Sequence, residues 1–116
     1  MIVLDSTRSL EVVLGGPVAT RQLPIVATYV DFVGTSHIPG ASHAHTNGAT
    51  PVTAVPAPPA GTDRHVHFLA VRNEDTATNK LAVRHGLVTW SGLLKPGDSL
   101  LYSSGEGFQI VFTGRE

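Results

Sequence analysis

The sequence predicts an all-β domain, built as a small antiparallel β-sandwich or a jelly-roll-like barrel with a long loop. Three observations lead to this prediction. No stretch carries apolar residues at the i, i+3, i+4 and i+7 spacing of an amphipathic helix. Short segments rich in Val, Ile, Leu, Thr, Phe and Tyr, which favour strands, recur at intervals of about ten residues. Between them, 12 glycines and 8 prolines supply turns.

The expected strands share this composition and are bounded by turn signals. In chain order they are Ser9–Leu14, Ile25–Val33, Val52–Val55, His65–Arg72, Lys80–His85, Leu87–Leu93, Ser99–Ser103 and Phe108–Thr113. Within His65–Arg72, Val66, Phe68 and Ala70 form one apolar face, and the opposite face also becomes apolar toward the end of the segment. A strand with two apolar faces belongs in the middle of a sheet.

Polar connections indicate how these strands are joined. Arg72–Asn79 predicts a hairpin that pairs the strands on its two sides. In Lys95–Asp98, proline followed by glycine predicts a type II turn with positive φ at Gly97.

The C-terminal segments are expected to form a meander. Ser103–Gly107 predicts a turn that brings Leu100 and Tyr102 beside Phe108 and Ile110. Because apolar alternation is densest here, we expect this meander to be the core of stability, with a large penalty for Phe108→Ala.

Two regions depart from the strand pattern within the single domain expected for residues 1–116. Gly34–Gly48 lacks alternation and predicts a loop, and Pro51–Pro59 is so rich in proline that it predicts an edge strand or an extended passage. Residues 34–59 are therefore expected to be a long loop with a proline-rich edge, ordered by a partner. Met1–Gly16 is apolar and is expected to be an assembly arm or an edge strand.

Charge and composition narrow the classes of partner. Only 15% of residues are charged and the net charge is −1, so we expect neither nucleic acid nor anionic membrane as a partner. Met1–Asp5 carries no basic segment of a Sec signal, which predicts a soluble protein. The absence of cysteine excludes disulfides and thiolate chemistry.

The six histidines are the residues whose number suggests a site. His43-x-His45 and His65-x-His67 place two imidazoles at i and i+2, which points both to one face of a strand. Two such pairs would suit a zinc or nickel ion. The alternative is that one pair lies in a solvated loop and the other on the polar face of a strand, and we expect no metal or cofactor.

No catalytic constellation is apparent, and we expect the protein not to be an enzyme. The chain has no G-x-S-x-G elbow, and its glycine-rich Gly15-Gly16-Pro17 and Gly105–Gly107 lack the lysine and helix of a phosphate loop. Paired carboxylates would have to come from Asp5, Glu11, Asp31, Asp63, Glu74, Asp75, Asp98, Glu106 and Glu116, most of which fall in expected turns. Trp90 is flanked by polar residues and is expected to be partly exposed at an interface.

Several motifs follow one another along the chain. An Asn-x-Asp at Asn73–Asp75 ends a strand, Leu94–Tyr102 reads L-x-x-G-D-x-L-x-Y, and Gly105–Phe108 reads G-x-G-F. With the opening Leu10–Gly16, Leu23-Pro24 and Tyr29–Asp31, this pattern resembles small structural proteins of tailed bacteriophages. The resemblance covers nearly the whole chain. It departs in Lys80–Trp90, which lacks an extended polar hairpin loop, and in the histidine-rich segment.

The resemblance implies a virion component of β-sandwich type without catalytic residues. We expect a capsid decoration (cement) protein located in the virion, bound to other virion proteins, above all the major capsid protein, and forming a homo-oligomer, with a trimer favoured. Two other functions stay open. One is a receptor- or carbohydrate-binding module of a tail or fibre that uses Trp90 and the loop. The other is a small metal-binding enzyme of cupin-like form.

Overall fold

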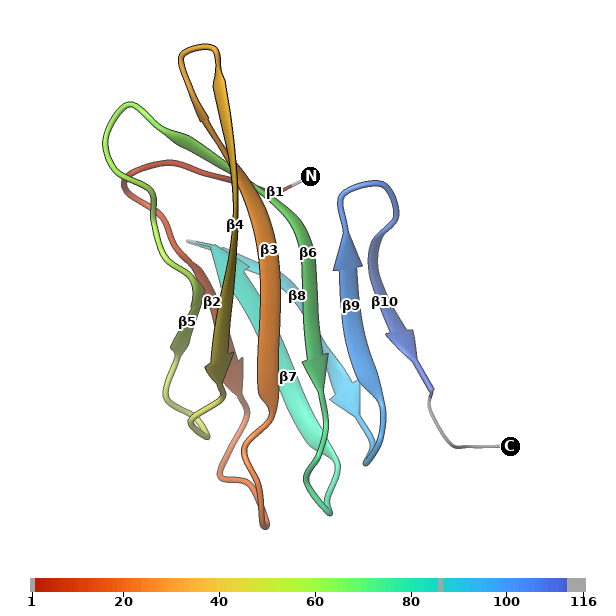
Figure 1. The fold of residues 1–116 in the computed structure, drawn as a ribbon. Helices are drawn as coiled ribbons and strands as arrows, with labels where there is room; N and C mark the ends of the chain where they lie inside the picture. Colours follow the sequence, from red (N-terminus) through yellow and green to blue (C-terminus); the bar gives the residue numbers. More distant parts are fainter. Residues whose placement is uncertain (1, 86, 113–116) are drawn as a thin grey trace.

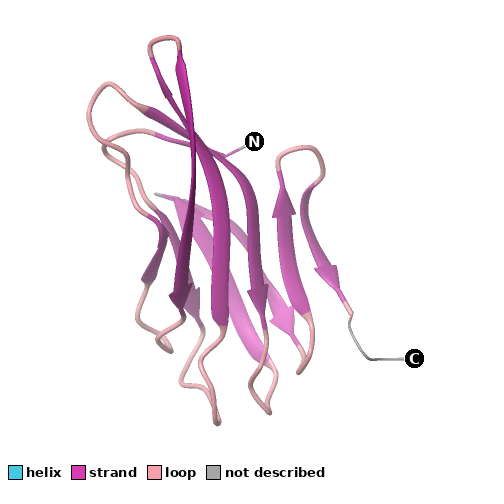
Figure 2. Ribbon diagram, viewed as in Figure 1, coloured by secondary structure: helices cyan, strands magenta, loops and turns pink. Residues whose placement is uncertain are grey.

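The computed structural model describes residues 2–85 and 87–112, which form ten strands and no helix (Figures 1 and 2). Met1, Thr113 and Glu116, named above, lie outside the described residues. Within the described part of the chain, no helix is long and apolar enough to cross a membrane. The prediction of an all-β fold is confirmed.

The strands form two antiparallel sheets that pack face to face, as in a β-sandwich (Figure 1). Sheet A has the order β10-β9-β6-β3-β4, with β1 also paired to β6, and sheet B has the order β5-β2-β7-β8. The bounds are β1 Ile2–Leu4, β2 Leu10–Leu14, β3 Pro24–Val33, β4 Ser36–His45, β5 Val52–Val55, β6 Asp63–Arg72, β7 Asn79–His85, β8 Leu87–Leu94, β9 Ser99–Ser103 and β10 Gly107–Val111.

The core lies between the sheets and draws side chains from both. Sheet A contributes Ile25, Val66, Leu69, Val71 and Leu100, and sheet B contributes Leu10, Val12, Leu81, Val83 and Leu94, all at most 1% exposed. The C-terminal meander supplies Leu100 and Tyr102 to this core, and its rank as the core of stability stays a prediction. Its pairing is as predicted, with Phe108 opposite Tyr102 and Ile110 opposite Leu100, but β10 is an edge strand and Phe108 is only half-buried.

The predicted loop over Gly34–Gly48 is wrong in its central part, because β4 is a ten-residue strand paired with β3 along its whole length. Alternation is missing because β4 is an edge strand whose side chains are mostly exposed. Proline is tolerated on an edge strand, as at Pro39. Gly40 is needed because the ring of Tyr29 lies over it, 2.6 Å from where a Cβ would be.

The rest of residues 34–59 agrees better with the sequence. The proline-rich stretch contains β5, which is an edge strand of sheet B as predicted. A side-chain bond joins it to β4, since Ser42 Oγ donates to the carbonyl of Ala54 at 2.5 Å. The region is thus fixed by the protein's own fold, and the expectation of a long loop ordered by a partner is corrected.

Two further expectations about pairing are wrong. Arg72–Asn79 does not close a hairpin, since β6 belongs to sheet A and β7 to sheet B, so this connection crosses between the sheets. Leu10–Leu14 is not an edge strand, because β2 lies between β5 and β7. The type II turn at Lys95–Asp98 agrees with the positive φ of 87° at Gly97.

Candidate functional site

The outer face of sheet A is the most distinctive surface of the molecule. On β3, inward Ile25 and Ala27 are buried, so their neighbours Val26 and Thr28 point outward. The strand register carries this alternation across the sheet. We call this surface the A face. Its apolar members are Val3, Val26, Val30, Phe32, Phe68, Ala70, Leu101 and Val111, of which Val3, Val26 and Val111 are exposed and the others half-buried.

Charges on the A face are confined to the two ends of β6. Asp63 begins this strand and Arg72 ends it, and both are exposed. Sheet B differs, because its outer face carries a cross-strand ion pair between Arg84 Nε and Glu11 Oε1 at 3.2 Å, together with exposed Lys80. The A face thus has the low-charge, apolar composition of a protein contact surface.

Histidines border this face, but the two His-x-His pairs do not meet. His43 is level with Val26 of β3, whereas His65 is level with Val30, four residues further along. His67 sits at a β-bulge, with Nδ1 3.4 Å from Ser104 Oγ. In the part of the chain that the structure describes, no three histidine or carboxylate side chains are placed to hold a metal ion.

One cluster of two histidines and a phenylalanine was not foreseen from the sequence. His37 of β4 and His65 of β6 lie on the two sides of Phe32, with ring centroids 4.5 and 4.4 Å from the phenyl ring. The arrangement follows from the register, since Phe32 is opposite His37 and His65 lies on the neighbouring strand. These aromatic contacts fix imidazoles on the A face rather than around a cavity.

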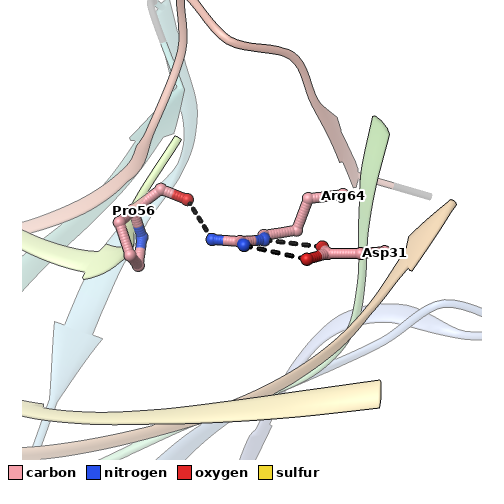
Figure 3. A network of polar contacts seen from close by, with 3 residues as sticks. All are labelled: Asp31, Pro56 and Arg64. Carbon is pink, nitrogen blue, oxygen red and sulfur yellow. Dashed lines mark hydrogen bonds and ion pairs between the residues drawn. The ribbon is translucent and has the colours of Figure 1, made fainter. Parts of the chain in front are cut away.

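A buried ion pair supports the end of the sandwich from which the β3–β4 hairpin projects, which we call the hairpin end (Figures 1 and 3). Arg64 donates to both carboxylate oxygens of Asp31 at 2.7 and 2.9 Å and to the carbonyl of Pro56 at 2.9 Å. Its guanidinium also lies 4.2 Å from the ring centre of Tyr29. The hydrogen bond with Asp31 raises the pKa of Arg64. The pair holds the β5–β6 connection against sheet A.

The opposite end of the molecule, which we call the loop end, carries residues of the Asn-x-Asp and Gly-Asp motifs. Asp75 accepts hydrogen bonds from the backbone N–H groups of Ala19, Thr20 and Thr76 and from Asn79 Nδ2, at 2.7 to 3.0 Å. These bonds, led by that of Asn79, lower the pKa of Asp75 well below its usual range.

Asn73 connects the neighbouring loops at this end. Its Nδ2 donates to the carbonyls of Ala77 and Leu94, and its backbone N–H donates to the carbonyl of Asp98. Asp98 is 1% exposed and accepts the N–H of Lys95 at 3.0 Å. The carboxylates of Asp75 and Asp98 therefore have a structural role, because they accept hydrogen bonds from backbone N–H groups of the loops.

Trp90 does not form an exposed platform. It is half-buried, and its ring stacks on Phe108 at a centroid distance of 6.0 Å. The stack fills the space between β8 and β10, at one side of the sandwich, and continues to Tyr102, 4.8 Å from Phe108. The use of Trp90 to bind carbohydrate thus has no support from its position.

Comparison with protein-family models, curated proteins and solved structures identifies no match to this chain. The A face must therefore be judged on its own geometry. A signal for it exists in the sequence, because Ile25–Val33 is apolar at both odd and even positions. Such a strand is covered on two faces, and only one of them can be the core.

Proposed function

We propose that the protein is a capsid decoration protein of a tailed bacteriophage, which acts by binding and not by catalysis. The observation that carries the proposal is the A face, which has eight exposed or half-buried apolar side chains and carries Asp, Glu, Lys or Arg only at the two ends of β6. Such surfaces mark contacts between proteins. The resemblance of the chain to small phage structural proteins indicates that the particle it binds is a phage virion.

The loop end adds support from a different direction. Asn73, Asp75 and Asp98, which carry the resemblance, all serve to tie loops together. A rigid domain of this kind suits a subunit that has to withstand the strain on a shell. Its weak individual contacts are multiplied by the symmetry of the particle, so that avidity holds it in place.

Purified virions provide the test. Mass spectrometry should detect this polypeptide at a fixed ratio to the major capsid protein, and particles that lack it should lose their genome at a lower temperature. Adding back the purified chain should restore heat resistance. Val26→Asp, on the A face, should weaken this restoration, whereas Lys80→Glu on the outer face of sheet B should not. Virions without the polypeptide would refute the proposal.

A further inference from the structure

The A face is complementary to itself in charge. Asp63 and Arg72 both point outward from β6 and are exposed, nine residues apart, which corresponds to about 30 Å along a strand. Among the described strands of sheet A, no other Asp, Glu, Lys or Arg side chain lies on this face. The face therefore has one negative end and one positive end, and the side chains between them include His37, His43 and His65 but no carboxylate, lysine or arginine.

The centre of the face holds one of its two phenylalanine side chains. Halfway between Asp63 and Arg72 lies the bulge of β6, where Phe68 points outward and is half-buried. Its cross-strand neighbour is Thr28, and Val26 and Ala70 are the next pair along. On its other side Phe68 is opposite Ser103, and the next row is apolar. An aromatic residue at the centre of a contact is often the one that dominates the binding energy.

We propose that the A face is the contact surface between two copies of this chain. The two-fold axis lies in the plane of the contact, runs across the strands and passes Phe68. Each β6 then opposes the other in antiparallel direction, Asp63 of each copy meets Arg72 of the second copy, and the two Phe68 rings meet at the axis. A two-fold axis parallel to the strands would instead place Asp63 against Asp63, so charge selects the first arrangement.

The size of the surface agrees with a dimer contact. The ten-residue strands β3, β4 and β6 extend about 33 Å, the five-residue strands β9 and β10 extend about 17 Å, and each strand is about 4.8 Å wide. The resulting area, on the order of 650 Å², is close to the roughly 800 Å² per partner of a standard interface. Asp63 and Arg72 each lie about 15 Å from the axis, so their pairing requires the two β6 strands to run close to antiparallel rather than at the crossing of about −30° that is common for packed sheets. The inference rests on the proposed function only in that it names a second copy of the chain as the occupant of the A face. It leaves the tip of the β3–β4 hairpin, between Val33 and Ser36, available to a shell.

Sedimentation equilibrium on the full chain at neutral pH tests the proposal. The wild-type chain should show a monomer–dimer equilibrium. Asp63→Arg and Arg72→Asp should each raise the dimer dissociation constant about tenfold or more, because each substitution creates two like-charge contacts per dimer. An equimolar mixture of the two variants should dimerise like the wild type, since every contact is then between opposite charges. Lys80→Glu, also an exposed charge reversal, is the control and should change nothing.

The mixture makes the outcome independent of any loss of stability in one variant, and far-UV circular dichroism checks that each chain is folded. A wild-type chain that is monomeric or trimeric at high micromolar concentration would overturn the dimer. So would single reversals without effect, or a mixture that fails to dimerise. A monomeric chain whose Val26→Asp variant still loses particle binding would refute the dimer and leave decoration standing. A chain that forms the dimer but is absent from virions would refute decoration and leave the dimer standing.

Discussion

The two ends of the sandwich both bury a charged side chain, but they satisfy it by different means. At the loop end, Asp75 is surrounded by neutral donors, four of them backbone N–H groups. At the hairpin end, Arg64 is met by the opposite charge of Asp31 and by one carbonyl. A carboxylate held by backbone dipoles depends on the folded path of the loops, whereas an ion pair depends on two replaceable side chains.

This difference determines how each end responds to substitution. Removing one member of the ion pair leaves the other buried without its partner, while removing both leaves an apolar gap that can be refilled. Removing Asp75 leaves N–H groups that no second substitution can take away. The hairpin end should therefore be rescued by a paired change, and the loop end should not.

The largest effect is expected for Arg64→Met. Asp31 would remain in a site where its side chain is only 16% exposed, and the bond to Pro56 would also be lost. We expect the free energy of unfolding to fall by about 3 kcal/mol, measured by urea denaturation. Combined with Asp31→Leu, the loss should shrink to within about 1 kcal/mol of the wild type. A double variant no more stable than Arg64→Met would show that the two ends do not differ in this way.

A smaller but still substantial effect is expected for Asp75→Asn. One acceptor oxygen becomes an NH2 group that faces N–H donors, so we expect the thermal midpoint to fall by roughly 5 to 10 °C at neutral pH. Thr76→Ala, an exposed change in the same loop that keeps the backbone N–H, should shift the midpoint little.

Acid titration sharpens the same comparison. The folded pKa of Asp75 is lowered, so its contribution to stability is complete above the unfolded value near 4 and is lost as the pH falls below it. Denaturation curves between pH 5 and 2 should therefore show a decline in the wild type that is shallower in Asp75→Asn. The pKa of exposed Asp5 is also lowered, by hydrogen bonds from Thr7, and Asp5→Asn serves as the control for local effects. Equal slopes in wild type and Asp75→Asn would contradict the assignment.

A neutral hydrogen bond should matter less than either charged group. The hydroxyl of Tyr102 accepts the backbone N–H of Ile2 at 2.7 Å, in a buried position. Tyr102→Phe should reduce the free energy of unfolding by about 1 kcal/mol and increase hydrogen exchange in β1, while leaving exchange in β7 unchanged. Uniform acceleration across the molecule would indicate that β1 does not open separately.

The smallest effect is expected for the ion pair on the outer face of sheet B. Glu11 and Arg84 have side chains 34% and 37% exposed, so solvent screens their attraction. Glu11→Gln should change the free energy of unfolding by about 0.5 kcal/mol or less in urea titrations. A loss comparable to that of Arg64→Met would mean that burial is not what separates strong from weak pairs in this protein.

Patterns carried by neighbouring residues were readable from the sequence. The composition of Lys80–His85 predicted a strand, and Pro96-Gly97 predicted a turn with positive φ. The pairing of strands that lie far apart in the sequence could not be predicted from it. Arg72–Asn79 has the composition of a hairpin turn, and nothing local indicates that it crosses between sheets.

The candidate site shows the same limit. Asp75 stood out as part of a motif, but its donors at Ala19 and Thr20 lie more than fifty residues away, so its role could not be inferred. β4 was missed because it is an edge strand whose side chains are mostly exposed to solvent, so its sequence shows no apolar alternation. The close approach of Tyr29 to Gly40 is visible only in the fold. Without β4 as a strand, the A face could not be recognised as one continuous surface.

The place of β2 within sheet B has a consequence for synthesis on the ribosome. Its partner β7 ends at His85, so the strand Leu10–Leu14 emerges long before β7 has been made. At 5 to 20 residues per second, the delay amounts to roughly 4 to 14 seconds. During that time the apolar side chains of Leu10, Val12 and Leu14 have no completed sheet to enter. Until the seventh strand has been made, the nascent chain therefore stays out of aggregates only if its aggregation is slow or if a chaperone holds it.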